Sequence, residues 1–256
     1  MSDLQKKAKS RIYFASDFHL GVPDAWASAE RERRIVRWLD CIEENAKEIF
    51  LLGDVFDFWF EYRDVVPKGY VRLLGKLATM ADNGCKIHFV CGNHDLWIRD
   101  YFEKDLGFII HRSAFETIID GKRFLIGHGD GLDFSDRKYR FISRLFKSRF
   151  CVAAFAALHP RWAYAIGKTW SRKSRLSHSE SDKVNLYEQE PIYKYCMAEL
   201  DKRNIDFFVF GHRHLKCNLS LKNGSRYINT GFWTTESPYA EWDGENLCLK
   251  NFDLGE

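Results

Sequence analysis

The chain has 256 residues, of which 45% are apolar and 16% aromatic, and its formal net charge is +3. This composition supplies enough apolar side chains for a large core and excludes a globally disordered chain. The nearly balanced charge does not by itself indicate a partner.

Apolar runs and helical periodicity alternate over the first 91 residues. The expected buried strands are 11–16, 48–53 and 86–91. Apolar residues with the spacing of one helix face predict helices around 35–42 and 71–81. The order strand, helix, strand, helix, strand predicts parallel strands joined by right-handed crossovers.

The second half of the chain begins with short strands and then changes composition. Strands are expected at 115–119, 123–126 and 206–210, and a helix near 193–200. The pairs Asn223-Gly224 and Asp243-Gly244 are hairpin signals. Residues 137–190 are expected to form a helical insertion. We therefore predict an α/β sandwich of two sheets, in a single domain over residues 1–256.

Polar side chains follow the predicted strands in five short motifs. The motifs are Asp17-x-His19, Gly53-Asp54, Gly92-Asn93-His94-Asp95, Gly127-His128 and Gly211-His212-x-His214. Loops converge at the carboxyl ends of parallel strands, so these side chains are expected to meet. Alternate residues of an extended segment point the same way, so each Asp-x-His or His-x-His pair can face one ion. Nitrogen and oxygen ligands without sulfur suit Mn, Fe, Zn or Ni better than a structural zinc site.

Each motif alone has an ordinary structural explanation. Asp17-x-His19 could be a polar pair at a strand end, Gly53-Asp54 a turn, and Gly211-His212-x-His214 a surface loop. Five such motifs in order, mostly at predicted strand ends, would need five coincidences. We therefore interpret them as one metal centre. His88 and His111 lie outside this set and are predicted to be structural or solvated.

The five motifs together resemble the calcineurin-type metallophosphoesterase superfamily, over residues 17–214. The resemblance implies a four-layer α/β/β/α sandwich and a bridged pair of divalent ions, with Mn²⁺ as the first choice and Fe, Zn or Ni as alternatives. It implies Asp17, His19, Asp54 and His214 as ligands of one ion. It implies Asp54, Asn93, His128 and His212 as ligands of the other ion, with Asp54 bridging.

The resemblance also implies a mechanism. Two ions about 3.5–4 Å apart share a water, make hydroxide available and offset charge on the phosphoryl group. Asn93, His94 and Asp57 are the expected catalytic residues. His94 would protonate the leaving oxygen, and the Asp57 carboxylate would orient the imidazole and favour its protonated form. Asp95 and Asp130 are expected to brace their loops.

The segment from Arg137 to Arg175 contains eleven Lys or Arg residues and no Asp or Glu, interleaved with Phe, Leu, Ile, Val and Trp. A basic helical segment rich in apolar residues predicts contact with a membrane surface or an amphiphile. The alternatives are a packed hairpin with a solvated basic face and a nucleic-acid-binding segment. The absence of acidic residues argues against the packed hairpin, and the many apolar residues argue against nucleic-acid binding.

Within the superfamily, the chain most resembles the UDP-2,3-diacylglucosamine hydrolases of lipid A biosynthesis. The matching stretches are 53–59 (Gly-Asp-Val-Phe-Asp-Phe-Trp), 128–130 (His-Gly-Asp) and the helical lid at 137–190. The implied reaction is hydrolysis of the pyrophosphate bond of UDP-2,3-diacylglucosamine to UMP and 2,3-diacylglucosamine 1-phosphate. The implied substrate-binding residues are Asn93, His94, Asp136, Tyr139, Ser174 and His212.

This resemblance also implies a location and partners. The expected partner is an acylated sugar nucleotide, handled at the cytoplasmic face of the inner membrane of a Gram-negative bacterium. The polar N-terminal residues do not resemble a signal peptide. The seven cysteines form no C-x-x-C pair and are odd in number, so reduced thiols are expected. No nucleic acid and no obligate protein partner are expected.

One position departs from the lipid enzymes. Their best-known members carry Arg where this chain has His94, and His at this place is the pattern of general phosphoesterases. A related metallophosphoesterase that acts on a nucleotide, or on another phosphodiester or phosphomonoester, therefore remains an alternative. A metal-free scaffold of the same fold is a third, which the intact ligand set disfavours.

Overall fold

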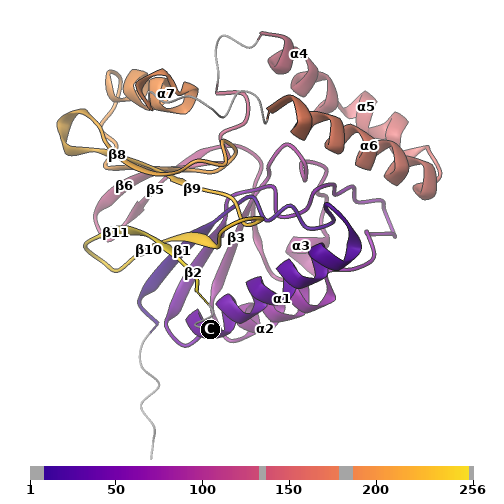
Figure 1. Cartoon of the computed structure of the whole chain (residues 1–256), viewed down its shortest axis with the longest axis horizontal. Coiled ribbons are helices and arrows are strands. Elements are labelled where there is room, and N and C mark those ends of the chain that lie inside the picture. The colour runs from indigo at the N-terminus through magenta and orange to yellow at the C-terminus, as the bar shows by residue number, and fades with distance from the viewer. Residues whose placement is uncertain (1–8, 133–136, 179–186, 254–256) are drawn as a thin grey trace, which may run out of the picture.

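The computed structural model describes residues 9–132, 137–178 and 187–253. Two β-sheets pack face to face between layers of helices (Figure 1). The first sheet has the order β11-β10-β1-β2-β3-β4. Its strands are β1 (Arg11–Ala15), β2 (Ala46–Leu51), β3 (Lys86–Val90), β4 (Ile109–His111), β10 (Pro238–Trp242) and β11 (Leu247–Asn251).

The second sheet has the order β5-β6-β7-β9-β8. Its strands are β5 (Phe115–Ile119), β6 (Lys122–Ile126), β7 (Phe207–Phe210), β8 (Lys216–Ser220) and β9 (Arg226–Thr230). The central strands are parallel in both sheets: β1 to β4 in the first, and β6, β7 and β9 in the second. The predicted parallel arrangement and both predicted hairpins, β8–β9 and β10–β11, are confirmed.

Helices cover the outer faces of the two sheets. The first sheet carries α1 (Ala25–Ile42), α2 (Val71–Asp82) and the short α3 (Tyr101–Lys104), and the second carries α7 (Pro191–Leu200) (Figure 1). Helix α1 begins where the Asp24 side chain accepts a hydrogen bond from the Ala27 amide, an N-cap. Its buried face includes Ile35, Trp38 and Leu39.

Three apolar layers separate the four structural layers. One lies between the first sheet and its helices, one between the sheets, and one between the second sheet and α7. In β1, Tyr13 joins the first layer, whereas Ile12 and Phe14 join the second. A strand buried on both faces appears as a continuous apolar run in the sequence. The α/β/β/α architecture predicted from the sequence is confirmed.

Three further helices connect β6 to α7. They are α4 (Arg137–Phe146), α5 (Arg149–Ala156) and α6 (Pro160–His178), and we call them the lid. The lid lies above the loops at one end of the sandwich (Figure 1). Helical structure was predicted for 137–190, and residues 179–186 of that range lie outside the described residues.

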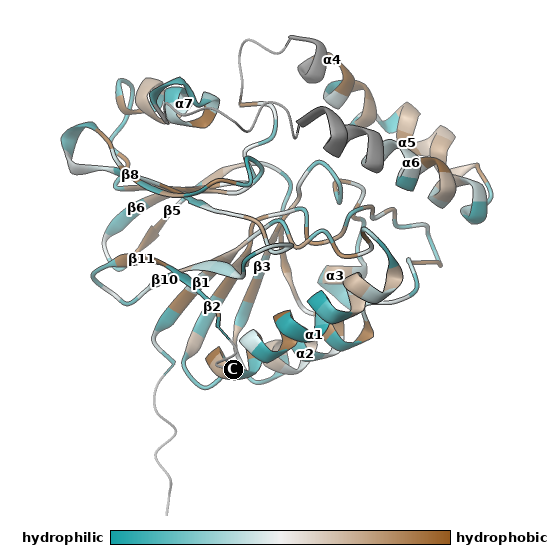
Figure 2. Ribbon diagram, viewed as in Figure 1, coloured by the Kyte–Doolittle hydropathy of each residue, from teal (hydrophilic) through white to brown (hydrophobic). Residues whose placement is uncertain are grey.

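Apolar side chains lie on the solvent-facing surface of the lid. Figure 2 shows apolar stretches along α5 and α6. Phe141, Phe150 and Trp162 have exposed fractions of 68%, 83% and 65%. Large apolar side chains exposed together usually mark an interaction surface. None of the described helices is both long and apolar enough to cross a membrane.

Candidate active site

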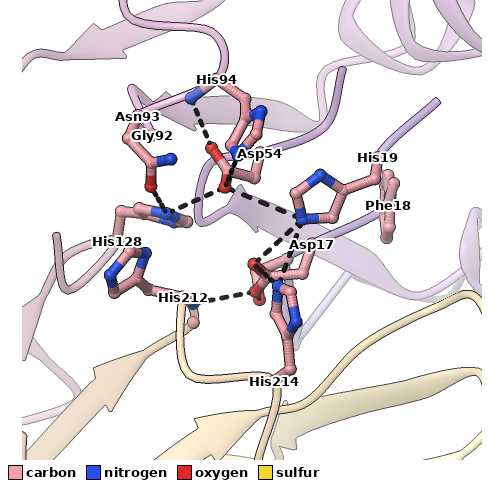
Figure 3. Close-up of polar contacts among 12 residues, drawn as sticks. Asp17, Phe18, His19, Asp54, Gly92, Asn93, His94, His128, His212 and His214 are labelled. Carbon is pink, nitrogen blue, oxygen red and sulfur yellow. Dashed lines mark hydrogen bonds and ion pairs between the residues drawn. The ribbon is translucent and has the colours of Figure 1, made fainter. Parts of the chain in front are cut away.

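The fold brings together all seven residues predicted to bind metal (Figure 3). Each lies just beyond the carboxyl end of a strand, and β1, β2, β3, β6 and β7 all contribute. The set is Asp17, His19, Asp54, Asn93, His128, His212 and His214. Parallel strands in both sheets therefore place these side chains at a single edge, as the sequence pattern predicted.

The backbone at the site is strained. Among the described residues, eight that are not glycine have a positive φ, and five of these belong to the predicted metal ligands. They are Asp17, His19, Asp54, His212 and His214, with φ between 43° and 69°. Left-handed backbone costs about 1–3 kcal/mol per residue and persists where the surrounding structure enforces it. Its concentration at one cluster is typical of a functional site.

Glycines allow the loops to approach one another. A Cβ at Gly53 would lie 2.8 Å from Nδ1 of His128. A Cβ at Gly92 would overlap the Asp54 carboxylate, and one at Gly211 would overlap the Asp17 carboxylate. These positions therefore require a residue without a side chain.

The first cluster consists of Asp17, His19 and His214. Asp17 Oδ1 lies 3.4 Å from Nε2 of His214 and 3.7 Å from Nε2 of His19, and the two Nε2 atoms are 3.3 Å apart. Two ligand atoms about 2.1 Å from one ion lie roughly 3.0–3.5 Å apart. Asp17 Oδ1 is also buried and makes no hydrogen bond within the described part of the chain. These residues fit a divalent cation.

The second cluster consists of Asp54, His128 and His212. Nε2 of His128 lies 3.3 Å from Asp54 Oδ2 and 3.2 Å from Oδ1 of Asn93. The same Asp54 oxygen lies 3.7 Å from Nε2 of His19, which belongs to the first cluster. One oxygen of Asp54 therefore lies close to histidines of both clusters.

Hydrogen bonds around the clusters orient the ligand atoms. Nδ1 of His128 lies 2.7 Å from the Leu52 carbonyl oxygen, which can only accept, so this nitrogen donates and Nε2 faces the cluster. The His94 amide donates to Asp54 Oδ1 at 2.9 Å, which leaves Oδ2 directed at the clusters. Asp95 accepts hydrogen bonds of 2.8 Å from the amides of Gly92 and Val55, and so joins two of the loops.

The charges of the site favour a cation. Burial raises the pKa of Asp17 and Asp54, but neighbouring histidines outweigh burial and lower both pKa values below the ordinary range. Both carboxylates are therefore ionised at neutral pH. Burial lowers the pKa of His128, but Asp54 outweighs it and raises that pKa to about 10. In the absence of a metal, this anionic site holds a proton that a cation can replace.

His94 is held differently from our expectation. Its Nδ1 lies 2.8 Å from the backbone carbonyl oxygen of Asp57, whereas the carboxylate oxygen Oδ1 of Asp57 is 4.0 Å away. Burial, followed by the charges of nearby histidines, lowers the pKa of His94 to about 4 even though Asp54 acts to raise it. In this structure, desolvation outweighs the effect of the nearby anions on the pKa of His94.

The sequence profile of the calcineurin-like phosphoesterases matches residues 10–216, which contain all five motifs. This chain belongs to the calcineurin-like phosphoesterase family. It is therefore a metal-dependent hydrolase, and the residues that meet at the strand ends suit divalent metals.

Relatives of this phosphoesterase include a UDP-2,3-diacylglucosamine hydrolase of Porphyromonas gingivalis, which is 38% identical over 96% of this chain and 98% of the relative. A UDP-2,3-diacylglucosamine hydrolase of Edwardsiella ictaluri is 25% identical, over 92% of this chain and 90% of the relative. Among solved structures, a dimetal phosphatase of Danio rerio superposes with a TM-score of 0.46 at 13% identity, over 96% of each chain.

Two cavities adjoin the active site of the phosphoesterase. One, of about 260 Å³, has a mixed lining that includes His128 and Asp130 as well as Val90 and Leu132. The other, of about 280 Å³, is lined mainly by apolar residues, including Phe60, Leu96, Trp97 and Val152. Both cavities are also lined by Cys91, Arg112 and Lys147. The basic pair Arg112 and Lys147 therefore borders both cavities.

The predicted substrate-binding residues divide into two groups. Asn93, His94 and His212 lie at the metal clusters. Asp136 lies outside the described residues, and the side chains of Tyr139 and Ser174, on α4 and α6, are also outside the described part.

Two lid contacts with the site were missed by the sequence analysis. Ser171 Oγ lies 2.9 Å from Nδ1 of His94, and Lys147 pairs with Asp130 at 3.2 Å. The only sequence signal for the first contact is the recurrence of small residues at Ala163, Gly167 and Ser171, which indicates a closely packed helix face.

Proposed function

We propose that this phosphoesterase hydrolyses the pyrophosphate bond of UDP-2,3-diacylglucosamine to UMP and 2,3-diacylglucosamine 1-phosphate, a step of lipid A biosynthesis. The observation that carries the proposal is the 38% identity, over nearly the full length of both chains, to a hydrolase named for that substrate. A polar metal site beside a basic, apolar lid suits a substrate that joins a diphosphate to acyl chains.

The proposed cofactors are two divalent ions, with Mn²⁺ first. Asp17, His19, Asp54 and His214 would hold one ion. Asp54, Asn93, His128 and His212 would hold the other. Ions in such a pair lower the pKa of a water and neutralise charge that develops on phosphoryl oxygens. The ligand atoms, most of them 3.2–3.7 Å from a neighbour in the same cluster, support this assignment.

Asn93, His94 and Asp57 would act on the diphosphate. The Oδ1 atom of Asn93 lies on the cluster side, next to His128, so its amide nitrogen is available to a phosphoryl oxygen. His94 donates Nδ1–H to the Asp57 carbonyl, which directs Nε2 into the site. An anionic diphosphate next to Nε2 would raise the pKa of His94, and the protonated ring could then donate to the departing phosphate oxygen.

The two cavities suit the two parts of the substrate. Arg112 and Lys147 offer cations to phosphate groups. Phe60, Leu96 and Trp97 offer an apolar surface to an acyl chain. Each buried methylene contributes about 0.8 kcal/mol, so even a few buried carbons would dominate binding. Asp136, Tyr139 and Ser174 remain proposed as further substrate contacts.

The lid would also place the enzyme at the cytoplasmic face of the inner membrane. Its cations Arg144, Arg149 and Lys168 are exposed, as are Phe150 and Trp162. Basic helices with exposed apolar side chains bind anionic bilayers. A diacylated substrate is held in such a bilayer, so binding there would bring the enzyme to it.

The test compares three substrates with the Mn²⁺-loaded protein: UDP-2,3-diacylglucosamine, UDP-N-acetylglucosamine and a soluble aryl phosphodiester. We expect kcat/KM for the acylated substrate to exceed that for UDP-N-acetylglucosamine by more than about 100-fold, since roughly four buried methylenes already supply that factor. Similar values for both UDP-sugars would refute the lipid function. The second candidate, a nucleotide or general phosphodiesterase, which His94 favours, would then be the better account.

A further inference from the structure

Helix α6 of the lid packs against the catalytic core through a row of small residues. Ala163 is fully buried, Ser171 has an exposed fraction of only 2%, and Gly167 lies between them, one turn from each. A Cβ at Gly167 would overlap the ring of Phe58. The glycine therefore lets α6 approach the core closely, and the next turn of the helix carries Ser171 to the active site.

Ser171 contacts His94 directly. Its Oγ lies 2.9 Å from Nδ1 of His94, and the carbonyl oxygen of Asp57 lies 2.8 Å from the same nitrogen. The carbonyl oxygen can only accept a hydrogen bond, so Nδ1 carries a hydrogen. This N–H donates a bifurcated hydrogen bond to the carbonyl oxygen and to the Ser171 hydroxyl oxygen. The other ring nitrogen, Nε2, then points towards the metal cluster, 3.9 Å from Asp54 Oδ2.

We propose that Ser171 is a positioning residue, through which the lid fixes the imidazole of His94 with Nε2 towards the leaving group. This inference rests on the proposed function, in which His94 acts on the leaving oxygen. The Asp57 carbonyl lies in the loop after β2, and Ser171 lies on α6. Together these two acceptors restrict the orientation of the imidazole ring more than the carbonyl alone would. Docking of the lid on the core therefore completes the arrangement of a group that acts in the reaction.

Other hydrogen bonds hold the lid without involving His94. The hydroxyl of Tyr164 donates to the Phe60 carbonyl oxygen at 2.6 Å, and the indole nitrogen of Trp97 donates to the Phe146 carbonyl oxygen at 3.0 Å. Phe155 also stacks on Trp97, with ring centroids 5.1 Å apart. Loss of the Ser171 hydroxyl should therefore leave the lid docked, and Tyr164→Phe provides a matched loss of a lid hydroxyl away from His94.

The experiment is a double-mutant cycle of Ser171→Ala and His94→Ala. It is measured on UDP-2,3-diacylglucosamine and on soluble phosphodiesters with leaving groups of graded basicity. Loss of one hydrogen bond predicts that Ser171→Ala lowers kcat about five- to tenfold with little change in KM. The loss should be largest for the most basic leaving group. In the His94→Ala background, Ser171→Ala should cause no further loss of kcat, because the imidazole that Ser171 positions is already absent.

Tyr164→Phe is the control in the same cycle. Any loss that it causes should be the same with and without His94. The proposal is overturned if Ser171→Ala has no effect on kcat, or if it lowers kcat by the same factor in both backgrounds, as a merely structural lid contact would. If the wild-type protein fails to cleave UDP-2,3-diacylglucosamine, the proposed function fails, and the soluble phosphodiesters still test the role of Ser171.

Discussion

The candidate metal ligands combine an unfavourable backbone with a favourable charge. Asp54 shows this most clearly: its φ is 52°, it is almost fully buried, and its Oδ2 faces histidines of both clusters. A buried carboxylate needs a positive charge beside it, from a protonated imidazole or a metal ion. The position is therefore better explained by metal binding than by stability.

Replacing Asp54 should empty much of the metal site. Asn tolerates left-handed backbone, so Asp54→Asn should fold. If Asp54 bridges two ions as proposed, its replacement should remove more than one equivalent of bound metal and lower activity by more than about 100-fold. Elemental analysis of the purified variant measures the first effect, and a phosphodiester assay measures the second.

Asp57→Asn is the matched control for this experiment. Asp57 is also a buried carboxylate, 3.6 Å from Nδ1 of His19, but it belongs to neither predicted metal cluster. The Asp57→Asn variant should retain the metal content of the wild type. A normal metal content in Asp54→Asn, or equal losses of bound metal in the two variants, would contradict the bridging role.

At the scale of elements, the sequence pattern predicted the features that depend on residues close together in the chain. The strands β1, β2 and β3 and the polar motifs after them were recognised because strand ends and glycines lie close together in the sequence. The three-residue strand β4 was missed, since so short a run has no readable period. His111, which was predicted to be structural or solvated, ends this strand.

Contacts between distant elements could not be read from the sequence. His94 and Ser171 are 77 positions apart, and their hydrogen bond depends on how closely α6 packs on Phe58. The partner of His94 on Asp57 was likewise expected to be the carboxylate, whereas the backbone carbonyl is nearer. Packing determines whether the carbonyl or the carboxylate of Asp57 faces His94, and the residue types alone allow either arrangement.

His111 joins β4 to its neighbouring strand β3 through a histidine pair. Its ring stacks on Phe115 with centroids 3.7 Å apart, and its Nε2 lies 3.0 Å from Nδ1 of His88. Nε2 of His88 in turn lies 3.1 Å from the Glu48 carboxylate on β2. Burial, followed by the charge of His88, lowers the pKa of His111 to about 4.

This lowered pKa predicts a loss of stability in acid. Between pH 6.5 and 4, the unfolded chain binds a proton at His111 that the folded protein does not bind, so the free energy of unfolding decreases as the pH falls. His111→Gln removes this titration. The variant should have a lower free energy of unfolding than the wild type at pH 7. This difference should be smaller by about 1 kcal/mol at pH 5. The value is reduced because the side chain is partly exposed.

Urea unfolding of both proteins at the two pH values measures this difference. Protonation of the metal site affects the wild type and the variant alike, so it cancels in the comparison. A stability difference that stays constant from pH 7 to pH 5 would show that His111 does not resist protonation in the folded state.

For the whole molecule, most of the exposed large apolar side chains of the described residues lie in or beside the lid, although Trp26 and Val71 of the core are also exposed. Phe150 and Trp162 are among the most exposed large apolar residues, and both belong to the lid. Exposed cations lie on the same three helices. The active site lies between this surface and the sandwich, which suits an enzyme that takes its substrate from a bilayer.

Reversing charges on the lid should therefore weaken membrane binding. In the triple variant Arg144→Glu, Arg149→Glu and Lys168→Glu, all three positions are exposed. Each cation near an anionic bilayer contributes about 1 kcal/mol, so the variant should bind phosphatidylglycerol vesicles more than about 100-fold more weakly at low salt. Vesicle sedimentation at two salt concentrations measures this, and the loss should shrink as salt screens the charges.

A control triple variant with the same change in net charge distinguishes the lid from a general electrostatic effect. The control changes are Lys47→Glu, Lys86→Glu and Lys122→Glu. These lysines lie at the beginnings of β2, β3 and β6, at the opposite ends of the strands from the metal ligands. This variant should bind vesicles nearly as well as the wild type. Both variants should cleave a soluble phosphodiester at the wild-type rate, because the metal site is intact, while only the lid variant should lose activity on vesicle-bound UDP-2,3-diacylglucosamine. Equal weakening by both triple variants would mean that net charge, and not the lid, governs membrane binding.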